Sequence, residues 1–362
     1  MTYKEVLLFV GKCLTISYEI RNKKDIEITL QQNDIDWDAV VKLSTAQLVL
    51  PALYLNFKNT NLLKYLPEDL VAYMAHITNL NRERNTQIIT QAHDIKTLLF
   101  TNNINPIFLK GTGNLLEGLY KDTGERMVGD IDFIVEKDYF LETVAILKDN
   151  GYVSKENINE AKHWHYPRLI HPKKIAAVEV HKKILKDDFQ YSLGIDLFSD
   201  VQLVNKDFRV LSAQNKLLAT TLPKIINDNL YHKKIITLRN AYDVFLISKL
   251  TKMDFTSIIE PKIHKKLNNY IGCMKIIFAD NPSILIDENS FSEHYKDSFE
   301  KLLKKNKLEK KKVQFISYYT KTSDRFEILK KSLNHKVYRK YVLKRIFELD
   351  FYKRLIGIKK PY

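Results

Sequence analysis

Apolar residues recur at helical spacing through the first hundred residues of the chain. Val6, Leu7 and Val10 open one such stretch, and a much longer one runs through 70–98. Steps of three and four residues place these side chains on one face of a helix. Residues 1–104 are therefore predicted to form a helical region that packs on the rest of the protein.

The pattern changes to short strands after this region. The segments 105–109, 130–135 and 174–182 are rich in Val, Ile and Phe, and the last two alternate apolar and polar residues. Alternation with a period of two is typical of strands with one buried face. Helical spacing lies between them at 138–148, where Asn-Gly follows as a helix stop, and it returns at 238–250.

We therefore expect an α+β fold, in which a core of strands and helices is flanked by an N-terminal and a C-terminal helical region. Ser212 is the expected cap of the first helix after the sheet. The predicted divisions are 1–104 for the N-terminal helices, 105–210 for the core, 211–300 for the helices that complete it, and 301–362 for a basic helical tail.

Asp130 and Asp132 share one face of an apolar strand, because Ile131 and Phe133 occupy the other. The strand rise separates their backbones by about 7 Å. Carboxylate oxygens are the ligands that Mg²⁺ prefers, so the pair is a candidate metal site. A surface strand with a solvated face has the same pattern, and the pair alone leaves both interpretations open.

A glycine-containing segment precedes this strand. Lys110-Gly-Thr-Gly113 is predicted to form a turn that leads into an amphipathic helix from Asn114 to Tyr120. Glycines at such a turn let backbone N–H groups approach an anion, and the helix N-terminus favours negative charge, so phosphate is the expected ligand. The alternative is an ordinary helix start with Thr112 as its cap.

A third acid is needed if two divalent cations share the site, because a phosphate alone does not balance four positive charges. Glu179 is the best candidate. It lies in a strand-like segment where Val178 and Val180 face one way while Glu179 and His181 face the other. A neighbouring strand would bring Glu179 beside the two aspartates, with His181 on the same face. The alternative is a solvated acid on an edge strand.

Taken in order, five segments resemble the uncharacterised bacterial nucleotidyltransferase family of the DNA polymerase β-like superfamily, over about residues 85–250. They are Lys110–Leu116, Leu119–Tyr120, Arg126–Val135, Asn150–Tyr152 and Val178–His181. The superfamily usually has a Gly-Ser turn about a dozen residues before its two aspartates. Here Gly111-Thr112 lies nineteen residues before Asp130, and threonine replaces the commoner serine.

The resemblance implies a core built on a small mixed β-sheet with helices, which binds a nucleoside triphosphate (NTP) and two Mg²⁺ ions, with Mn²⁺ as a substitute. Asp130 and Asp132 would hold both metals, and Glu179 would complete the catalytic set. The residues implied to bind nucleotide are Lys110, Gly111, Thr112, Asn114, Arg126, His181, Arg239 and Asp243.

Three of these residues have alternatives. Arg126 is either a phosphate clamp or a surface arginine in a loop. Arg239 and Asp243 are four residues apart on one helical face, so they either contact the nucleotide or pair with each other, and pairing is the favoured interpretation.

The positive charge of the chain is concentrated at its end. Residues 301–362 hold 20 Lys and Arg against 5 Asp and Glu, whereas the signs balance in residues 1–300. Lys301–Lys312 is predicted to be a basic helix or linker, and Tyr338–Phe347 interleaves aromatic and basic residues. Such a tail suits RNA or an anionic membrane surface. Its alternative is a lysine-rich solvated surface.

Composition limits the remaining classes. No apolar run reaches about eighteen residues and the N-terminus lacks the layout of a signal peptide, so we expect no membrane span and a cytoplasmic location. Cys13 and Cys273 give neither a disulfide framework nor zinc spacing. His163, His165 and His171 lack neighbouring ligands that would complete a zinc site, so structural or substrate-facing roles are favoured.

Three functions remain open. The first is transfer of a nucleoside monophosphate from an NTP to a hydroxyl of a small molecule, sugar or protein. The second is an RNA-directed version that uses the basic tail. The third is a nucleotide-binding protein without turnover.

Overall fold

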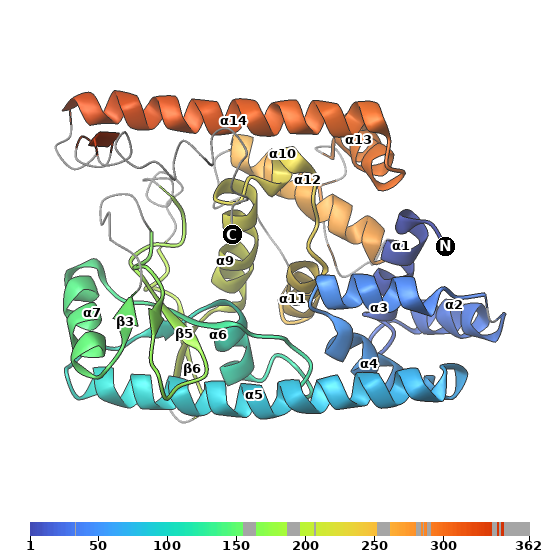
Figure 1. Cartoon of the computed structure of the whole chain (residues 1–362), viewed down its shortest axis with the longest axis horizontal. Helices are drawn as coiled ribbons and strands as arrows, with labels where there is room; N and C mark the ends of the chain where they lie inside the picture. The colour runs from blue at the N-terminus through green and yellow to red at the C-terminus, as the bar shows by residue number, and fades with distance from the viewer. Residues whose placement is uncertain are drawn as a thin grey trace.

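The computed structural model describes the whole chain except residues 33, 155–163, 187–195, 206–207, 252–260, 280–283, 285, 288–290, 335–338, 340–341 and 344–362. Two long helices, α5 and α14, run along opposite edges of the molecule (Figure 1). The sheet lies toward one end between them, and the N-terminal helices lie toward the other end. Helices α9 and α11 fill the middle, and buried side chains from the N-terminal helices, α5, the sheet and these two helices form one hydrophobic cluster.

The N-terminal region is helical, as predicted. Thr2 caps the first helix in a capping box with Glu5, and the long element predicted near residue 70 is α5, a helix of 33 residues. The helices are α1 (Tyr3–Cys13), α2 (Ile20–Gln31), α3 (Trp37–Ala46), α4 (Leu50–Asn59) and α5 (Glu68–Phe100).

Two buried asparagines on α5 hold the loop that precedes the central strand. The side-chain amide of Asn81 donates to the carbonyls of Gly124 (2.7 Å) and Arg126 (3.1 Å), and that of Asn85 donates to the Arg126 carbonyl (2.7 Å). Buried backbone carbonyls need such partners, because an unpaired one costs the energy of a lost hydrogen bond. Helix α5 therefore fixes the path of the chain as it enters the sheet.

Within the described part of the chain, the sheet has seven strands in the order β3-β4-β5-β2-β1-β7-β6. Strand β2 is parallel to β5, and β1 is parallel to β7, whereas the other pairings are antiparallel. This confirms the predicted α+β fold with a mixed sheet. The strands are β1 (Ile107–Phe108), β2 (Asp130–Ile134), β3 (Val153–Ser154), β4 (Leu169–Ile170), β5 (Ala177–His181), β6 (Val201–Val204) and β7 (Phe208–Leu211).

The helix after β1 starts earlier than predicted. The sequence indicated a turn before Asn114, but α6 spans Lys110–Glu117 and ends at Gly118, which has a left-handed conformation. The glycines serve close packing instead of a turn, because a Cβ at Gly113 would lie 2.6 Å from the carbonyl oxygen of Phe108. The prediction failed because glycine marks a close backbone approach as readily as a turn.

Helices complete the core after the sheet, as predicted. The hydroxyl of Ser212 accepts a hydrogen bond from the Asn215 N–H and caps α9, which confirms the expected helix start. Almost every residue of α11 is buried. The helices are α7 (Phe140–Asp149) within the sheet region, then α9 (Ala213–Ile226), α10 (Leu230–Lys233), α11 (Leu238–Ser248), α12 (Pro261–Ile277), α13 (Glu293–Leu303) and α14 (Lys307–Asn334).

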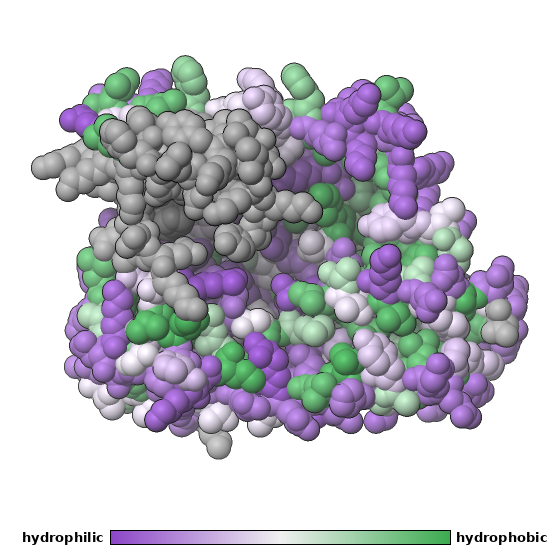
Figure 2. Space-filling model, in the orientation of Figure 1, coloured by the Kyte–Doolittle hydropathy of each residue, from purple (hydrophilic) through white to green (hydrophobic). Residues whose placement is uncertain are grey.

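The segment Lys301–Lys312, expected to be a basic helix or linker, is divided between two helices. It contains the end of α13, a short turn and the start of α14. Hydrophobic side chains project from the edge of the molecule that α14 forms (Figure 2). Most of the aromatic and basic segment 338–347 lies outside the described residues. No helix within the described ranges is long and apolar enough to cross a membrane.

Candidate active site

The parallel register of β2 and β5 brings the predicted acids together. Asp132 is the direct neighbour of Glu179 across the two strands, and Asp130 is the neighbour of Ala177. Side chains at paired positions point to the same face of a sheet. Asp132 and Glu179 are buried, whereas Asp130 at the start of β2 is half-buried. The two aspartates and the glutamate therefore share one face, as the sequence predicted.

Lys110 provides the first positive charge at this face. Its Nζ lies 2.6 Å from Asp132 Oδ1 and 3.9 Å from Glu179 Oε2. Lys110 is the first residue of α6 and has a φ of +50°, a left-handed backbone conformation that is uncommon for residues other than glycine and asparagine. This backbone conformation costs about 1–3 kcal/mol, and it occurs at a residue that contacts the carboxylates directly.

Arg168 bridges two of the acids from the other side. Its Nη2 lies 2.7 Å from Asp130 Oδ2, and its Nε lies 2.9 Å from Glu179 Oε1. The residue directly precedes β4, which pairs with β5, so the sheet itself delivers the guanidinium to the acids. The side chain is 61% exposed, so it can also reach a molecule that arrives from solvent.

His181 lies beneath the same cluster. Its Nε2 is 2.9 Å from Asp132 Oδ1 and 3.7 Å from Glu179 Oε2. Because a carboxylate only accepts, Nε2 carries the proton of this hydrogen bond. The other ring nitrogen, Nδ1, is buried and has no partner among the described residues.

The cations decide the protonation of the cluster. Burial by itself raises the pKa of Glu179, but the His181 imidazole and the charges of Lys110 and Arg168 outweigh it and hold the pKa well below its usual value. Burial raises the pKa of Asp130, and the neighbouring carboxylates add to that effect. Although burial opposes its charge, the acids raise the pKa of Lys110, which stays an ammonium. The site is therefore a compact set of opposed charges.

The donor set suits a hard divalent cation. Asp132, Glu179 and His181 are buried, and they offer ligand atoms that lie within 4.8 Å of one another. Carboxylate oxygens are the usual ligands of Mg²⁺ and Mn²⁺, and a neutral imidazole can join them for Mn²⁺. Asp130 adds a further carboxylate at the edge of this group.

The N-terminal end of α6 faces β2. The Thr112 hydroxyl donates to the backbone carbonyl of Asp130 (2.9 Å), so Thr112 ties the helix to the strand. It is not the helix cap, because Leu109 occupies that position. Gly111 and Thr112 belong to the first turn, where backbone N–H groups have no partner within the helix.

Arg126 and Asp243 form a buried pair instead of a surface loop contact. Arg126 Nε and Nη2 lie 2.8 and 2.7 Å from the two carboxylate oxygens of Asp243. The Tyr120 hydroxyl also donates to Asp243 (2.8 Å) and accepts from the Asn114 amide (3.1 Å). Burial opposes the charge of Arg126, but Asp243 raises its pKa above the usual value. This network connects α6, α11 and the loop before β2.

The favoured pairing of Arg239 with Asp243 is wrong. Arg239 Nη1 donates to the backbone carbonyl of Met127 (3.1 Å), and within the described residues it forms no ion pair. Four-residue spacing permits a pair on an isolated helix, but Asp243 is already engaged by Arg126 from another element. Burial and the charge of Arg126 lower the pKa of Arg239.

Arg168 is the functional candidate that the sequence analysis missed. The segment 151–179 drew attention to its histidines, and an arginine before a short strand carries no local motif. Electrostatics could have indicated such a residue, because three clustered acids require positive charge near them. Of the three histidines, His165 pairs with His181 in an isolated β-bridge, and burial lowers its pKa. His171 accepts a hydrogen bond from the Lys173 N–H. His163 lies outside the described residues.

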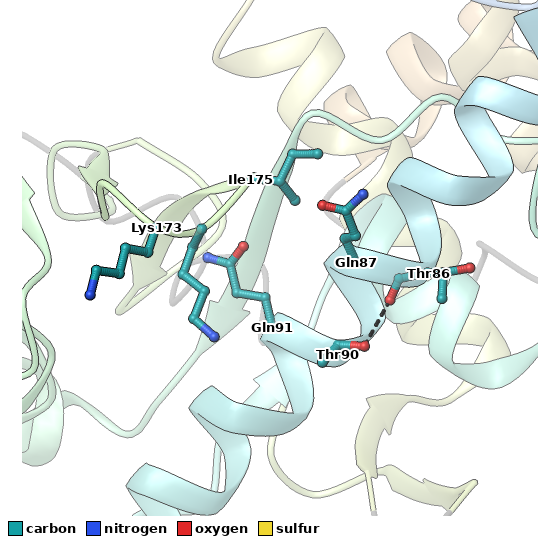
Figure 3. Close-up of a pocket in the computed structure, with 7 residues that line it drawn as sticks. Thr86, Gln87, Thr90, Gln91, Lys173 and Ile175 are labelled. Atoms are coloured by element: carbon teal, nitrogen blue, oxygen red, sulfur yellow. Dashed lines mark hydrogen bonds between the residues drawn. The ribbon is translucent and has the colours of Figure 1, made fainter.

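A pocket of about 230 Å³ lies between α5 and the segment that leads into β5 (Figure 3). Gln91 exchanges two hydrogen bonds with the backbone of Ala176 and so pins the start of β5. Thr86, Gln87, Thr90, Ile175 and two lysines line the remainder, and none of the clustered carboxylates does.

One comparison with known proteins gave a match. A family described as uncharacterised nucleotidyltransferase matches residues 33–275, which is more than half of the chain and contains every candidate site residue. Searches of curated proteins and of solved structures gave no match.

Proposed function

Because this chain belongs to a family of uncharacterised nucleotidyltransferases, we propose that it transfers a nucleoside monophosphate from an NTP to a hydroxyl acceptor, using divalent metal. One observation supports this proposal above all others. The adjacent strands β2 and β5 bring Asp130, Asp132 and Glu179 to one face, where Lys110 and Arg168 contact them. Three clustered carboxylates repel one another, and a bound divalent cation would offset this repulsion.

The metal-binding residues of the proposal are Asp130, Asp132 and Glu179, and His181 would orient Asp132 through the hydrogen bond that its Nε2 donates. Mg²⁺ is the expected ion, in two copies, and Mn²⁺ is its substitute. When bound, the ions would stabilise charge on the attacking and leaving oxygens at phosphorus. The depressed pKa of Glu179 keeps this carboxylate ionised and able to act as a ligand.

Positive groups of the chain would bind the triphosphate. Lys110 lies beside the acids and can neutralise phosphate oxygens as a point charge, with the N–H groups of Gly111 and Thr112 next to it. Arg168 is exposed and its planar guanidinium can bind phosphate through two hydrogen bonds. As the acceptor oxygen bonds to the α-phosphorus and pyrophosphate leaves, these cations would hold the departing charge in place.

Other predicted nucleotide-binding residues take a positioning role in this proposal. Arg126, Asp243 and Asn114 are joined through Tyr120 in the buried network described above. This network fixes α6, and α6 carries Lys110. Arg239 remains a candidate for direct contact, because within the described residues it donates to the backbone carbonyl of Met127 and forms no ion pair, while burial and the like charge of Arg126 lower its pKa.

The proposal is tested by incubating the full-length protein with each of four NTPs labelled at the α-phosphate, with Mg²⁺ and fractions of cell lysate as acceptors. We expect label to move to a lysate component, and Asp132→Asn to abolish this transfer. Asp138→Asn, an exposed aspartate outside the cluster, is the matched control. Label that appears on RNA would favour the RNA-directed alternative. NTP binding without pyrophosphate release in any fraction would favour the non-catalytic alternative and contradict the proposal.

A further inference from the structure

Helix α14 carries an unusual row of exposed apolar side chains. Seven large residues on it are between 49% and 73% exposed. They are Leu308, Phe315, Tyr318, Tyr319, Phe326, Leu329 and Leu333. We call this row the α14 stripe. Hydrophobic groups stand out on this edge of the molecule in the space-filling view (Figure 2).

The members of the α14 stripe share one side of the helix. Successive helical residues are separated by about 100°, and on this basis the seven side chains fall within an arc of about 100°. From Leu308 to Leu333 the stripe extends for about 38 Å at 1.5 Å per residue. Isolated exposed apolar residues are ordinary, but seven large ones along one side of a single helix are typical of an interaction surface.

Positive charge borders the stripe. Lys312 and Lys330 lie about 20° beyond one side of the arc, and Lys311 lies within the arc, about 20° from its other side; all three are exposed. The helix as a whole contains eight Lys and Arg against three Asp and Glu. Of these acids, Glu309 is buried against Ser298 and also pairs with Lys312. The outward side therefore combines apolar and cationic groups.

We propose that the α14 stripe binds the surface of an anionic lipid bilayer, with the helix lying in the plane of the interface. Apolar side chains would enter the boundary between headgroups and acyl chains, while the bordering lysines reach the anionic headgroups. The helix would lie on the membrane and not cross it, in agreement with the absence of a spanning helix among the described residues.

The composition of the stripe favours lipid over two other occupants. RNA would use the cations and the aromatic rings, but Leu308, Leu329 and Leu333 have no flat face on which a base could stack. A second copy of the chain would place two positively charged helices against each other, which like-charge repulsion disfavours. An anionic bilayer uses both the aliphatic and the cationic groups.

Flotation of the full-length protein with vesicles tests this proposal. We expect binding to phosphatidylcholine vesicles that contain phosphatidylserine, weaker binding to phosphatidylcholine alone, and loss of binding as salt is raised. Phe315→Ser with Phe326→Ser should weaken binding by at least about tenfold. The matched control, Phe100→Ser with Leu141→Ser, removes two similarly exposed apolar residues from α5 and α7 and should bind as the wild type does.

A second variant keeps the test decisive if the first does not fold, as judged by circular dichroism and thermal unfolding. Lys311→Gln with Lys312→Gln leaves the apolar row intact and should weaken binding to the anionic vesicles by about tenfold. Equal binding of either folded variant and the wild type would overturn the proposal. It would also be overturned if the wild type bound single-stranded RNA but no vesicles, or formed a dimer through the stripe without binding vesicles.

Discussion

Asp243→Asn separates a structural from a nucleotide-binding role of the buried pair with Arg126. Both residues are nearly inaccessible, with exposures of 8% for Arg126 and 2% for Asp243, and two hydrogen bonds of 2.7 and 2.8 Å join them. The amide retains one acceptor but no charge, so the guanidinium stays buried without its counterion. Removing one partner of a buried pair costs about 3–5 kcal/mol, and we expect a loss of at least about 3 kcal/mol in the free energy of unfolding.

Urea unfolding at neutral pH provides the assay, because a shift of the midpoint at constant slope reports stability. Asp228→Asn is the matched control. Asp228 pairs with Lys224 at the same distance of 2.7 Å, but both side chains are more than a third exposed, so the loss should stay under about 1 kcal/mol. Replacing both buried partners, Arg126→Met with Asp243→Leu, should recover much of the stability. The reasoning is refuted if Asp243→Asn costs no more than Asp228→Asn.

Three further predictions follow from the site and its surroundings. Burial, with the nearby charge of Asp122, raises the pKa of Glu125 from 4.5 to about 7, so between these pH values the unfolded chain releases a proton that the folded chain keeps. The free energy of unfolding should therefore fall by about 3 kcal/mol as pH rises through this window. Glu125→Gln should reduce the difference between the free energies of unfolding measured in urea at pH 5 and pH 8, and an unchanged difference would contradict this prediction. Arg168→Gln should raise the KM for NTP by about tenfold, while Lys137→Gln on an exposed turn leaves it unchanged, and steady-state kinetics with equal KM values would count against a phosphate contact. Thr112→Val removes the hydroxyl that ties α6 to the Asp130 carbonyl, and it should lower the free energy of unfolding in urea by about 1–3 kcal/mol. Thr90→Val, at an exposed position of α5, should lower it little, and equal losses would contradict the role of this bond.

The alternation of residues predicted the strands and the faces of the acids, because the strand period depends only on local geometry. Asp132, Glu179 and His181 share a face in the structure for this reason. The direction of pairing required more. That β5 lies parallel to β2, and that it is the direct neighbour of this strand, depends on how the chain crosses over between residues 135 and 176.

Contacts between distant elements were the part that sequence could not supply. Asp243 has a cation four residues away on its own helix, yet it binds Arg126, which is 117 residues away along the chain. Arg168 reaches Asp130 only because β4 joins the edge of β5. In each case a local rule named a reasonable partner, and the competition among side chains in the folded core selected another.

Binding of Mn²⁺, measured by electron paramagnetic resonance of the free ion, tests the central claim most directly because it requires no knowledge of the acceptor. The account predicts that the wild-type protein binds Mn²⁺, that added NTP tightens this binding, and that Asp132→Asn abolishes it. Asp138→Asn should bind Mn²⁺ as the wild type does. Equal Mn²⁺ binding by the wild type and Asp132→Asn, with NTP present, would contradict the assignment of Asp130, Asp132 and Glu179 as the metal site.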